Sequence, residues 1–174
     1  MAKQEYTVRN ARPEEFEQIG ALMVQVYSQL EGFPKISEQP DYYKMLANVG
    51  ALTNNPGTAL LVAVGDDDRI GGAVVYFNEM KYYGSGGTAT REENAAGFRL
   101  LAVDPAIRGK GIGRLLANEC INTARENKLG QVIIHTTMAM QTAWKMYEQM
   151  GFKRSEDLDF SQQGFPVFGF RLLL

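Results

Sequence analysis

The chain has 174 residues, of which 45% are apolar and 22% are charged, and its formal net charge is −2. These values are typical of one globular domain with a sizeable core, and they argue against a disordered chain and against a dedicated binder of nucleic acid or anionic membranes. Cys120 is the only cysteine, so an intrachain disulfide is excluded and a reducing compartment is expected.

Targeting signals are not expected. The opening letters Met-Ala-Lys-Gln-Glu contain no apolar core, unlike a signal peptide. Uninterrupted apolar runs, such as residues 59–64, are far shorter than the ~20 residues that cross a bilayer. We therefore expect one domain over residues 1–174, located in the cytoplasm, with no membrane or nucleic-acid partner.

The first third of the chain combines one strand pattern with two helical patterns. Residues 5–10 alternate apolar and polar side chains, which predicts a strand. Pro13 opens a pattern of helical spacing that continues to Leu30. Gly32-Phe33-Pro34 interrupts that pattern, and a second helix is expected over residues 41–52.

Two strands and a long loop are expected next. Residues 58–65 and 70–78 are apolar and flank three aspartates at 66–68, which predicts a hairpin. Residues 79–96 have no periodicity and include the glycine-rich letters Gly-Ser-Gly-Gly at 84–87. Loops of this length in a compact domain are usually functional or disordered, and we expect this one to border a substrate site.

The rest of the chain again alternates strand and helix patterns. Strands are expected at 98–103, 132–135, 152–157 and 167–173, and helices at 112–127 and 141–150. The resulting order, β-α-α-β-β-β-α-β-α-β-β, predicts a single-domain layered α/β fold with a mixed central sheet.

The letters Arg108-Gly109-Lys110-Gly111-Ile112-Gly113 form the turn between a strand and a helix. Glycine in a first helical turn is costly, but it leaves the unpaired backbone N–H groups open to a ligand. The helix dipole and the nearby basic side chains favour an anion such as a pyrophosphate. The spacing matches neither the GxxxxGK[ST] phosphate loop nor the GxGxxG dinucleotide motif.

Two segments together resemble a known family. Arg108, Gly111 and Gly113, between a strand ending Leu-Ala-Val-Asp-Pro and a helix, resemble the acetyl-CoA site of GNAT-type N-acetyltransferases. Residues 143–152 resemble the family's Ala-x-x-x-Tyr-x-x-x-Gly-Phe segment, which closes the same site. The resemblance covers about residues 97–154 and implies a GNAT-like fold with acetyl-CoA as the acyl donor.

The resemblance also implies where the donor lies. In this family the strands before and after the glycine turn splay apart, and the pantetheine arm occupies the cleft. The backbone of Leu101, Ala102 and Val103 would pair with the arm as another strand would. The pyrophosphate would contact the turn and the start of its helix, formed by Arg108, Gly109, Lys110, Gly111, Ile112, Gly113 and Arg114.

Tyr147 is the candidate general acid, because the resemblance places its phenol beside the departing sulfur. A phenol has an ordinary pKa of ~10 and is protonated at neutral pH. Alternatively, Tyr147 has no catalytic role and only packs its helix onto the sheet. Relatives often carry an Asn that bonds the pantetheine three residues before the Ala of the second motif, but this chain has Met140 there.

The general base stays open. Family members often carry Glu near position 97, where this chain has Gly97. Glu92 and Glu93, in the long loop, are possible bases or solvated surface charges. His135, the only histidine, is a possible base, a substrate contact or a strand-end residue.

Aromatic side chains beside the irregular segments are expected to contact the acceptor, or else to pack the rim of the domain. They are Phe33, Tyr82 and Tyr83, together with Tyr42 and Tyr43. The histidine and the cysteine form no cluster, so no metal site is expected.

The expected activity is acetyl transfer from acetyl-CoA to a primary amine, directly and within a ternary complex. The alternatives are an acyltransferase with another acyl group or a hydroxyl acceptor, and a non-catalytic acetyl-CoA sensor or interaction module. The acceptor is a small-molecule or peptide amine, and the acidic balance favours a cationic one only weakly. The C-terminal strand could pair across a homodimer.

Overall fold

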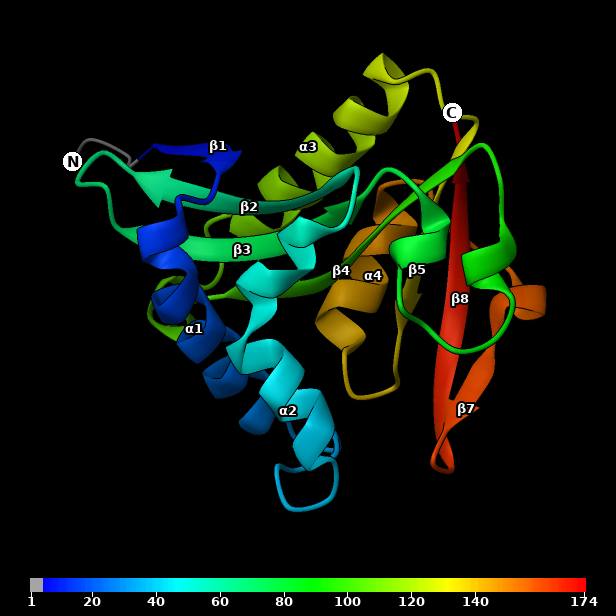
Figure 1. Ribbon diagram of the computed structural model, residues 1–174, viewed down its shortest axis with the longest axis horizontal. Coiled ribbons are helices and arrows are strands. Elements are labelled where there is room, and N and C mark those ends of the chain that lie inside the picture. Colours follow the sequence, from blue (N-terminus) through cyan, green and yellow to red (C-terminus); the bar gives the residue numbers. More distant parts are fainter. Residues whose placement is uncertain (1–4) are drawn as a thin grey trace.

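The computed structural model describes residues 5–174, so the expectation about a signal peptide falls largely on residues outside the described part. Its centre is one mixed sheet with the strand order β1-β2-β3-β4-β5-β8-β6, and β7 pairs with β8 (Figure 1). The strands are β1 (Tyr6–Asn10), β2 (Thr58–Gly65), β3 (Ile70–Phe77), β4 (Ala95–Val103), β5 (Gln131–Thr136), β6 (Lys153–Arg154), β7 (Phe160–Gln162) and β8 (Phe165–Leu173). The predicted layered α/β class is confirmed.

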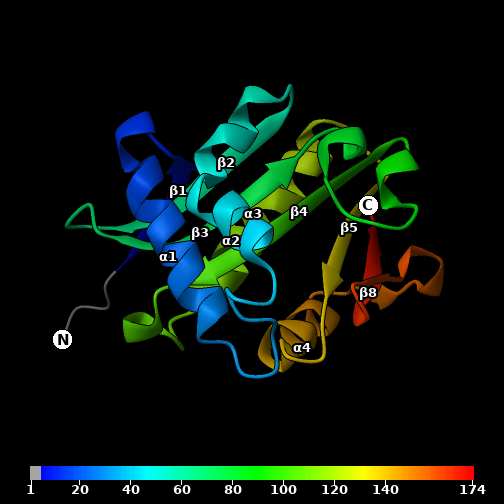
Figure 2. The same ribbon diagram turned by 60° about the horizontal axis from the view of Figure 1, so that its bottom comes forward.

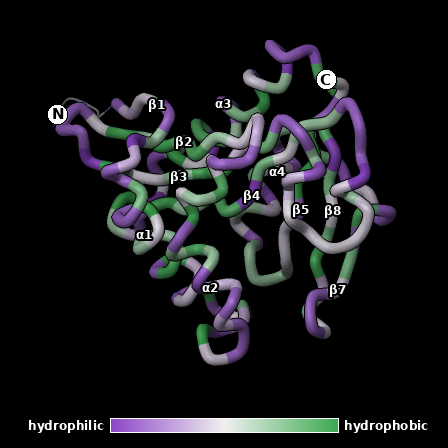
Figure 3. Tube along the Cα trace, in the orientation of Figure 1, coloured by the Kyte–Doolittle hydropathy of each residue, from purple (hydrophilic) through white to green (hydrophobic). Residues whose placement is uncertain are grey.

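Helices cover both faces of the sheet. They are α1 (Phe16–Ser28), α2 (Pro40–Ala47), α3 (Ile112–Glu126) and α4 (Gln141–Gln149). The apolar residues of α1 and α2 pack on one face, and those of α3 and α4 pack on the other, which gives two separate cores (Figures 1 and 2). Because both faces are covered, β2 and β3 are apolar along most of their length (Figure 3).

The site is positioned by a divergence between β4 and β5. These two strands are the parallel pair of the sheet, and their pairing spans only Ala95 to Gly97 against Gln131 to Ile133. Beyond this point β4 has an irregular register with β3, and Leu100 has a φ of 61°, which marks a bulge. The strands then separate, as Figure 2 shows. One edge of β4 from Phe98 onward is left without a strand partner from β5.

The second helical segment is shorter than expected. Instead of one helix over 41–52, α2 ends at Ala47 and a 3-10 helix covers Val49–Asn54. Asn48 separates them, and its side-chain amide donates to the Lys44 carbonyl. Side-chain competition of this kind for backbone groups is a common reason for a helix to end at Asn.

The C-terminal region also differs from the sequence prediction. The strand expected at 152–157 is reduced to the two residues of β6, followed by a 3-10 helix at Glu156–Leu158. A further strand, β7, forms a hairpin with β8 through Gln163 and Gly164, both at positive φ. β8 is thus paired on one side with β5 and on the other with β6 and β7, so most of its edge is occupied within the chain. The possible homodimer through the C-terminal strand stays a prediction.

The long loop at 79–96 is packed rather than open. It contains two 3-10 helices, Met80–Tyr82 and Ala89–Arg91, and buries Met80, Tyr83 and Ala89. Cys120 is fully buried in α3. Within residues 5–174, no helix combines the length and the apolarity that a membrane span requires.

Candidate active site

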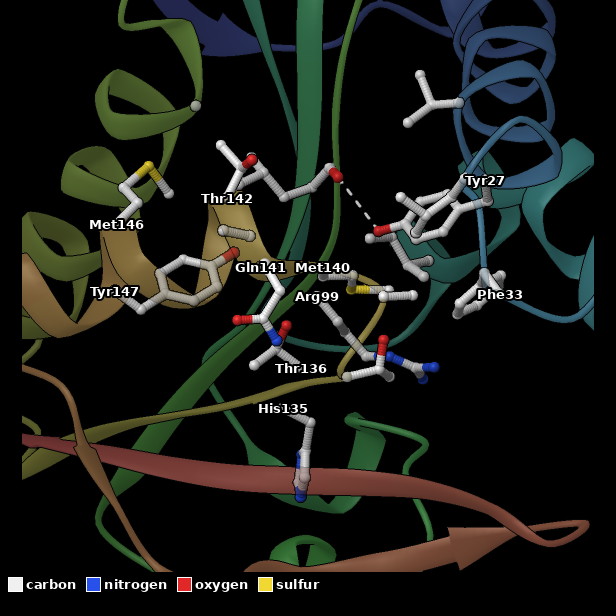
Figure 4. A pocket seen from close by; sticks show the side chains of 18 of the residues that line it. Tyr27, Phe33, Arg99, His135, Thr136, Met140, Gln141, Thr142, Met146 and Tyr147 are labelled. Carbon is white, nitrogen blue, oxygen red and sulfur yellow. Dashed lines mark hydrogen bonds between the residues drawn. The ribbon is translucent and has the colours of Figure 1, made fainter.

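A cavity of about 820 Å³ opens where β4 and β5 diverge. Its walls come from the start of α3, from α4, from the segment between α1 and α2, and from the β7–β8 hairpin. Figure 4 shows labelled side chains from α1, β4, β5 and α4 converging on a common space. A volume in this range is typical of a site for a small ligand or cofactor.

One end of the cavity is the N-terminus of α3. Gly111 precedes the helix with a φ of 77°, and the first helical bond runs from the Leu115 N–H to the Gly111 carbonyl. The N–H groups of Ile112, Gly113 and Arg114 therefore have no acceptor in the helix, and they carry the positive end of its dipole. A Cβ atom added at Gly109 or Gly111 would meet nothing within 4 Å, so these glycines are required by their positive φ rather than by crowding.

Basic side chains surround this turn. Arg108 and Arg114 are exposed and line the cavity, and Arg114 donates to Gln149 of α4 at 2.9 Å. Lys145 of α4 adds a third charge, whereas Lys110 is exposed and does not line the cavity. The turn and its charges are suited to an anion, and the pyrophosphate site predicted from the glycines stays a prediction.

The free edge of β4 forms one wall. The side chains of Leu101 and Val103 line the cavity, whereas Ala102 is buried in the core beneath α1 and α2. The hydroxyl of Tyr27, on α1, donates to the Leu101 carbonyl at 3.2 Å (Figure 4). Tyr27 is a cavity residue that the sequence does not indicate, because its helical spacing makes it look like an ordinary core position.

Tyr147 of α4 lies deep in the cavity. Its side chain is 5% exposed, and its ring packs at 5.8 Å from the rings of Phe98 and Phe152. The hydroxyl points into the space near Gln141 (Figure 4) and has no hydrogen-bond partner among the described residues. Burial raises the pKa of Tyr147 well above its ordinary value, so the phenol stays protonated.

Two threonines at the end of β5 carry unpaired hydroxyls. Thr136 and Thr137 are 2% and 4% exposed, and neither side-chain oxygen has a partner. Both residues line the cavity. A buried hydroxyl without a partner is unfavourable, so these two groups are suited to a polar ligand in the gap.

His135 is engaged at both ring nitrogens. Its Nε2 lies 2.9 Å from the Leu158 carbonyl, which can only accept, so Nε2 carries the proton. Nδ1 then accepts from the Tyr83 hydroxyl at 3.0 Å. Burial lowers the pKa of His135, so the neutral ring is favoured. Both residues line the cavity.

The Tyr83 ring also explains why position 97 is a glycine. A Cβ atom at position 97 would lie 2.9 Å from the Met80 sulfur and from the Tyr83 ring. A larger side chain is therefore excluded there, and the Tyr83–His135 pair stands close to where relatives are expected to carry a glutamate.

The structure does not bring the two candidate glutamates to the cavity. Glu92 is held by Arg171 of β8, with a distance of 2.6 Å from Oε1 to the guanidinium. Glu93 is exposed, and neither residue lines the cavity. The expectation that the loop presents a carboxylate base is corrected, because the loop folds against β8 with its Glu92 side chain. Phe33 and Tyr83 line the cavity, but Tyr82 faces a neighbouring hollow instead.

A family model for the acetyltransferase (GNAT) family matches residues 23–152. The chain belongs to this GNAT family. The match includes the glycine turn, the diverging strands and Tyr147, and the predicted resemblance is therefore confirmed.

Curated relatives match the chain over part of its length. An N-acetylaspartate synthetase from Danio rerio is 35% identical over 74 residues, which cover 42% of this chain and 26% of that protein. An N-alpha-acetyltransferase 30 from Xenopus laevis is 37% identical over 59 residues, which cover 34% of this chain and 22% of that protein. These matches span about a quarter of the length of the relatives.

Solved structures of GNAT proteins share the whole fold. A GNAT acetyltransferase from Staphylococcus aureus Mu50 has a TM-score of 0.73 at 17% identity, covering 98% of this chain and 99% of that one. The protein yncA from Salmonella typhimurium, solved with its cofactor acetyl-CoA, has a TM-score of 0.67 at 16% identity and covers 97% of this chain and 94% of that one.

The GNAT family uses acetyl-CoA, and the residues of this cavity fit that molecule. The anion site at α3 suits its pyrophosphate. The unpaired hydroxyls of Thr136 and Thr137 and the free edge of β4 suit the amides of its pantetheine arm. Within residues 5–174, no group of three or more His, Cys, Asp or Glu side chains is placed to hold a metal ion.

Proposed function

We propose that this GNAT protein transfers the acetyl group of acetyl-CoA to a primary amine, directly and within a ternary complex. The observation that carries the proposal is the gap between β4 and β5. It leads from the free N–H groups of α3 to the Tyr147 hydroxyl, so one cavity joins a phosphate site to a proton donor.

The donor is held along this gap. Arg108, Arg114 and the first turn of α3 bind the pyrophosphate by charge-assisted hydrogen bonds. The backbone of residues 101–103 pairs with the pantetheine arm as an added strand, with the Tyr27 hydroxyl fixing the Leu101 carbonyl. Thr136 and Thr137 supply the hydrogen bonds that an asparagine would supply in relatives.

The chemistry needs one proton donor and one proton acceptor. The amine nitrogen attacks the thioester carbon, the carbon–sulfur bond breaks, and Tyr147 protonates the departing thiolate. The amine proton passes to the Tyr83 hydroxyl while the Tyr83 proton moves to Nδ1 of His135, which is neutral and already accepts that hydrogen bond. Solvent then takes the added proton from His135 and returns a proton to Tyr147, which resets both groups.

Direct transfer is favoured because no thiol nucleophile reaches the cavity. Cys120 is fully buried within α3, and burial raises the pKa of its thiol. We also propose a cytoplasmic location, because a sequence with one cysteine forms no intrachain disulfide.

The first experiment is a calorimetric titration with acetyl-CoA. The test variant is Arg108→Ala combined with Gly113→Ala, and the matched control is Arg125→Ala at the far end of α3. Gly113 is the better position to block, because an added Cβ would make only ordinary contacts of 3.7 Å and 3.8 Å with its neighbours. We expect the test variant to lose at least 30-fold in affinity and the control to bind normally.

The second experiment is an acetyl-transfer assay with a broad amine panel. Several relatives are named for N-acetylaspartate synthesis, so aspartate belongs in that panel. Binding without any transfer would identify a sensor module instead. Absence of acetyl-CoA binding to the folded wild type would overturn the proposal entirely.

A further inference from the structure

The charges around the cavity all have one sign. The charged residues among those that line it are Arg99, Arg108, Arg114 and Lys145, and no Asp or Glu of the described chain joins them. Three of these cations surround the α3 and α4 end, where the pyrophosphate is proposed to bind. Arg99 lies apart from them, on β4 just before the bulge, and is not needed for the donor.

None of the described residues supplies a counter-charge to Arg99. Its side chain is half-buried, and one guanidinium nitrogen donates to the Tyr83 carbonyl at 2.9 Å. The guanidinium lies 5.8 Å from the centre of the Tyr83 ring. No described carboxylate lies within ion-pair distance of it. A partly buried cation that lacks an anion is unfavourable, and a bound anion would compensate for it.

The acidic groups named around this end are engaged elsewhere or face solvent. Glu38 and Asp41 border a neighbouring hollow that Arg99 also reaches. Glu38 accepts from the Lys35 N–H at 3.0 Å, and Asp41 is exposed. Asp159, whose charge acts on His135, is paired with Arg154 at 2.7 Å. One of the five guanidinium N–H groups of Arg99 is used by the Tyr83 carbonyl, so within the described part of the chain the other four are free to donate to a ligand.

Arg99 lies away from the proposed pyrophosphate site, at the end of the cavity that we assign to the acceptor. Figure 4 shows Arg99 between His135 and Phe33, on the opposite side of the space from Met146. Tyr42 also lines the cavity with Arg99 and belongs to the aromatic wall of this end. The wall also includes Phe33 and Phe165, whose ring centres are 5.8 Å apart.

We propose that the acceptor is a free amino acid or a similar small amine that carries a carboxylate, and that Arg99 binds this carboxylate. The inference rests on the proposed acetyl transfer and names its substrate class. A guanidinium fork holds a carboxylate in one orientation, and the amine then faces Tyr83 and His135. A cationic acceptor would find no counter-charge among the described residues that line the cavity. This proposal is therefore the opposite of the weak expectation that the acidic net charge favours a cationic acceptor.

The test compares acceptors that differ only in the carboxylate. L-Phenylalanine and L-aspartate are matched with L-phenylalaninamide and L-aspartic acid diamide, and putrescine represents the cationic amines. Binding is measured by calorimetry on protein saturated with CoA, and transfer is measured as KM and kcat. In the wild type we expect at least one carboxylate acceptor to bind at least tenfold more tightly than its amide.

The test variant is Arg99→Gln, which keeps a donor for the Tyr83 carbonyl but removes the charge. It should raise the Kd and KM of the carboxylate acceptor at least 30-fold, with those of the amide and of acetyl-CoA unchanged. Arg99→Lys should restore part of the preference. Arg91→Gln, an exposed arginine outside the cavity, is the matched control.

Equal losses for acid and amide would assign Arg99 a structural role and overturn the inference. A wild-type preference for the amides or for putrescine would do the same, even if Arg99→Gln fails to fold. Carboxylate-selective binding without acetylation of any acceptor would instead contradict the proposed function and leave the recognition by Arg99 standing.

Discussion

The hydroxyl of Tyr147 reaches the cavity while its ring is fixed between Phe98 and Phe152. For Tyr147→Phe, we expect kcat to fall about 100-fold, a loss typical of removing a general acid, with an unchanged Kd for acetyl-CoA. Because burial raises the pKa of Tyr147, the wild type should not lose activity through its ionisation below pH ~10.

Tyr76→Phe serves as the control for this measurement. Its hydroxyl bonds to Asn78 at 2.8 Å and lies outside the cavity. If the rate is the same in Tyr147→Phe and in the wild type, Tyr147 is only a packing residue.

Removal of the unpaired Thr136 hydroxyl should have opposite effects on the stability of the protein and on its affinity for acetyl-CoA. Thr136→Val removes a buried polar group without a partner, so we expect the free energy of unfolding of the free protein to rise by up to about 1 kcal/mol. The affinity for acetyl-CoA should fall about tenfold, because a ligand hydrogen bond is lost. Chemical denaturation and calorimetry measure the two effects.

Thr58 offers a matched control, since its hydroxyl is also buried and unpaired but lies outside this cavity. Thr58→Val should stabilise the protein to a similar extent and leave the affinity for acetyl-CoA unchanged. A loss of stability in Thr136→Val would show that the hydroxyl already has a partner in the free protein.

At the scale of an element, the start of α1 depends on one ion pair. Glu15 accepts two hydrogen bonds from Arg9, at 2.8 Å and 2.9 Å, and a third from the Arg12 N–H. The Arg9 hydrogen bonds hold the pKa of Glu15 at about 2. This stability is present above the ordinary pKa of a glutamate and is lost as the pH falls toward 2.

We therefore expect Glu15→Gln to lower the free energy of unfolding by about 1–2 kcal/mol at pH 7, after allowing for solvent screening. The difference from the wild type should vanish near pH 2. Urea denaturation at several pH values measures it, with Glu14→Gln as the exposed control. A difference that does not depend on pH would mean that packing, rather than the charge, is responsible.

At the scale of the molecule, the gap between β4 and β5 makes stability depend on the ligand. Only three residue pairs connect these strands, so the two halves of the sheet share few backbone bonds. A ligand in the gap bridges both halves. At 100 times its Kd, acetyl-CoA should add about 2.7 kcal/mol, which raises the Tm by roughly 5–10 °C for a chain of this size.

Thermal denaturation with increasing acetyl-CoA measures this effect. The combined Arg108→Ala and Gly113→Ala variant should lose most of the stabilisation, and pantetheine, which lacks the pyrophosphate, should give a much smaller shift than acetyl-CoA. An equal shift with pantetheine would argue against the anion site at α3.

Some site residues carried a signal in the sequence that could have identified them. Arg99 interrupts an apolar strand, and Thr136 and Thr137 directly follow one, so each is a polar group at an expected strand end or edge. Tyr27 carries no such signal, because its spacing equals that of the core residues of its helix. The ion pair that removes Glu92 from the site joins residues 79 positions apart, and no local pattern reports it.

Local chemistry was sufficient for the α/β class, for most elements and for the glycine turn at the start of α3, whose role as a phosphate site stays a prediction. Periodicity and the glycine turn act within a few residues, and a turn binds an anion through its own backbone. The tertiary structure decided the arrangement at the other end of the cavity. The packing of the 79–96 loop excluded its glutamates, placed Tyr83 against His135 and left Arg99 without a counter-charge, because these relations depend on contacts between distant segments.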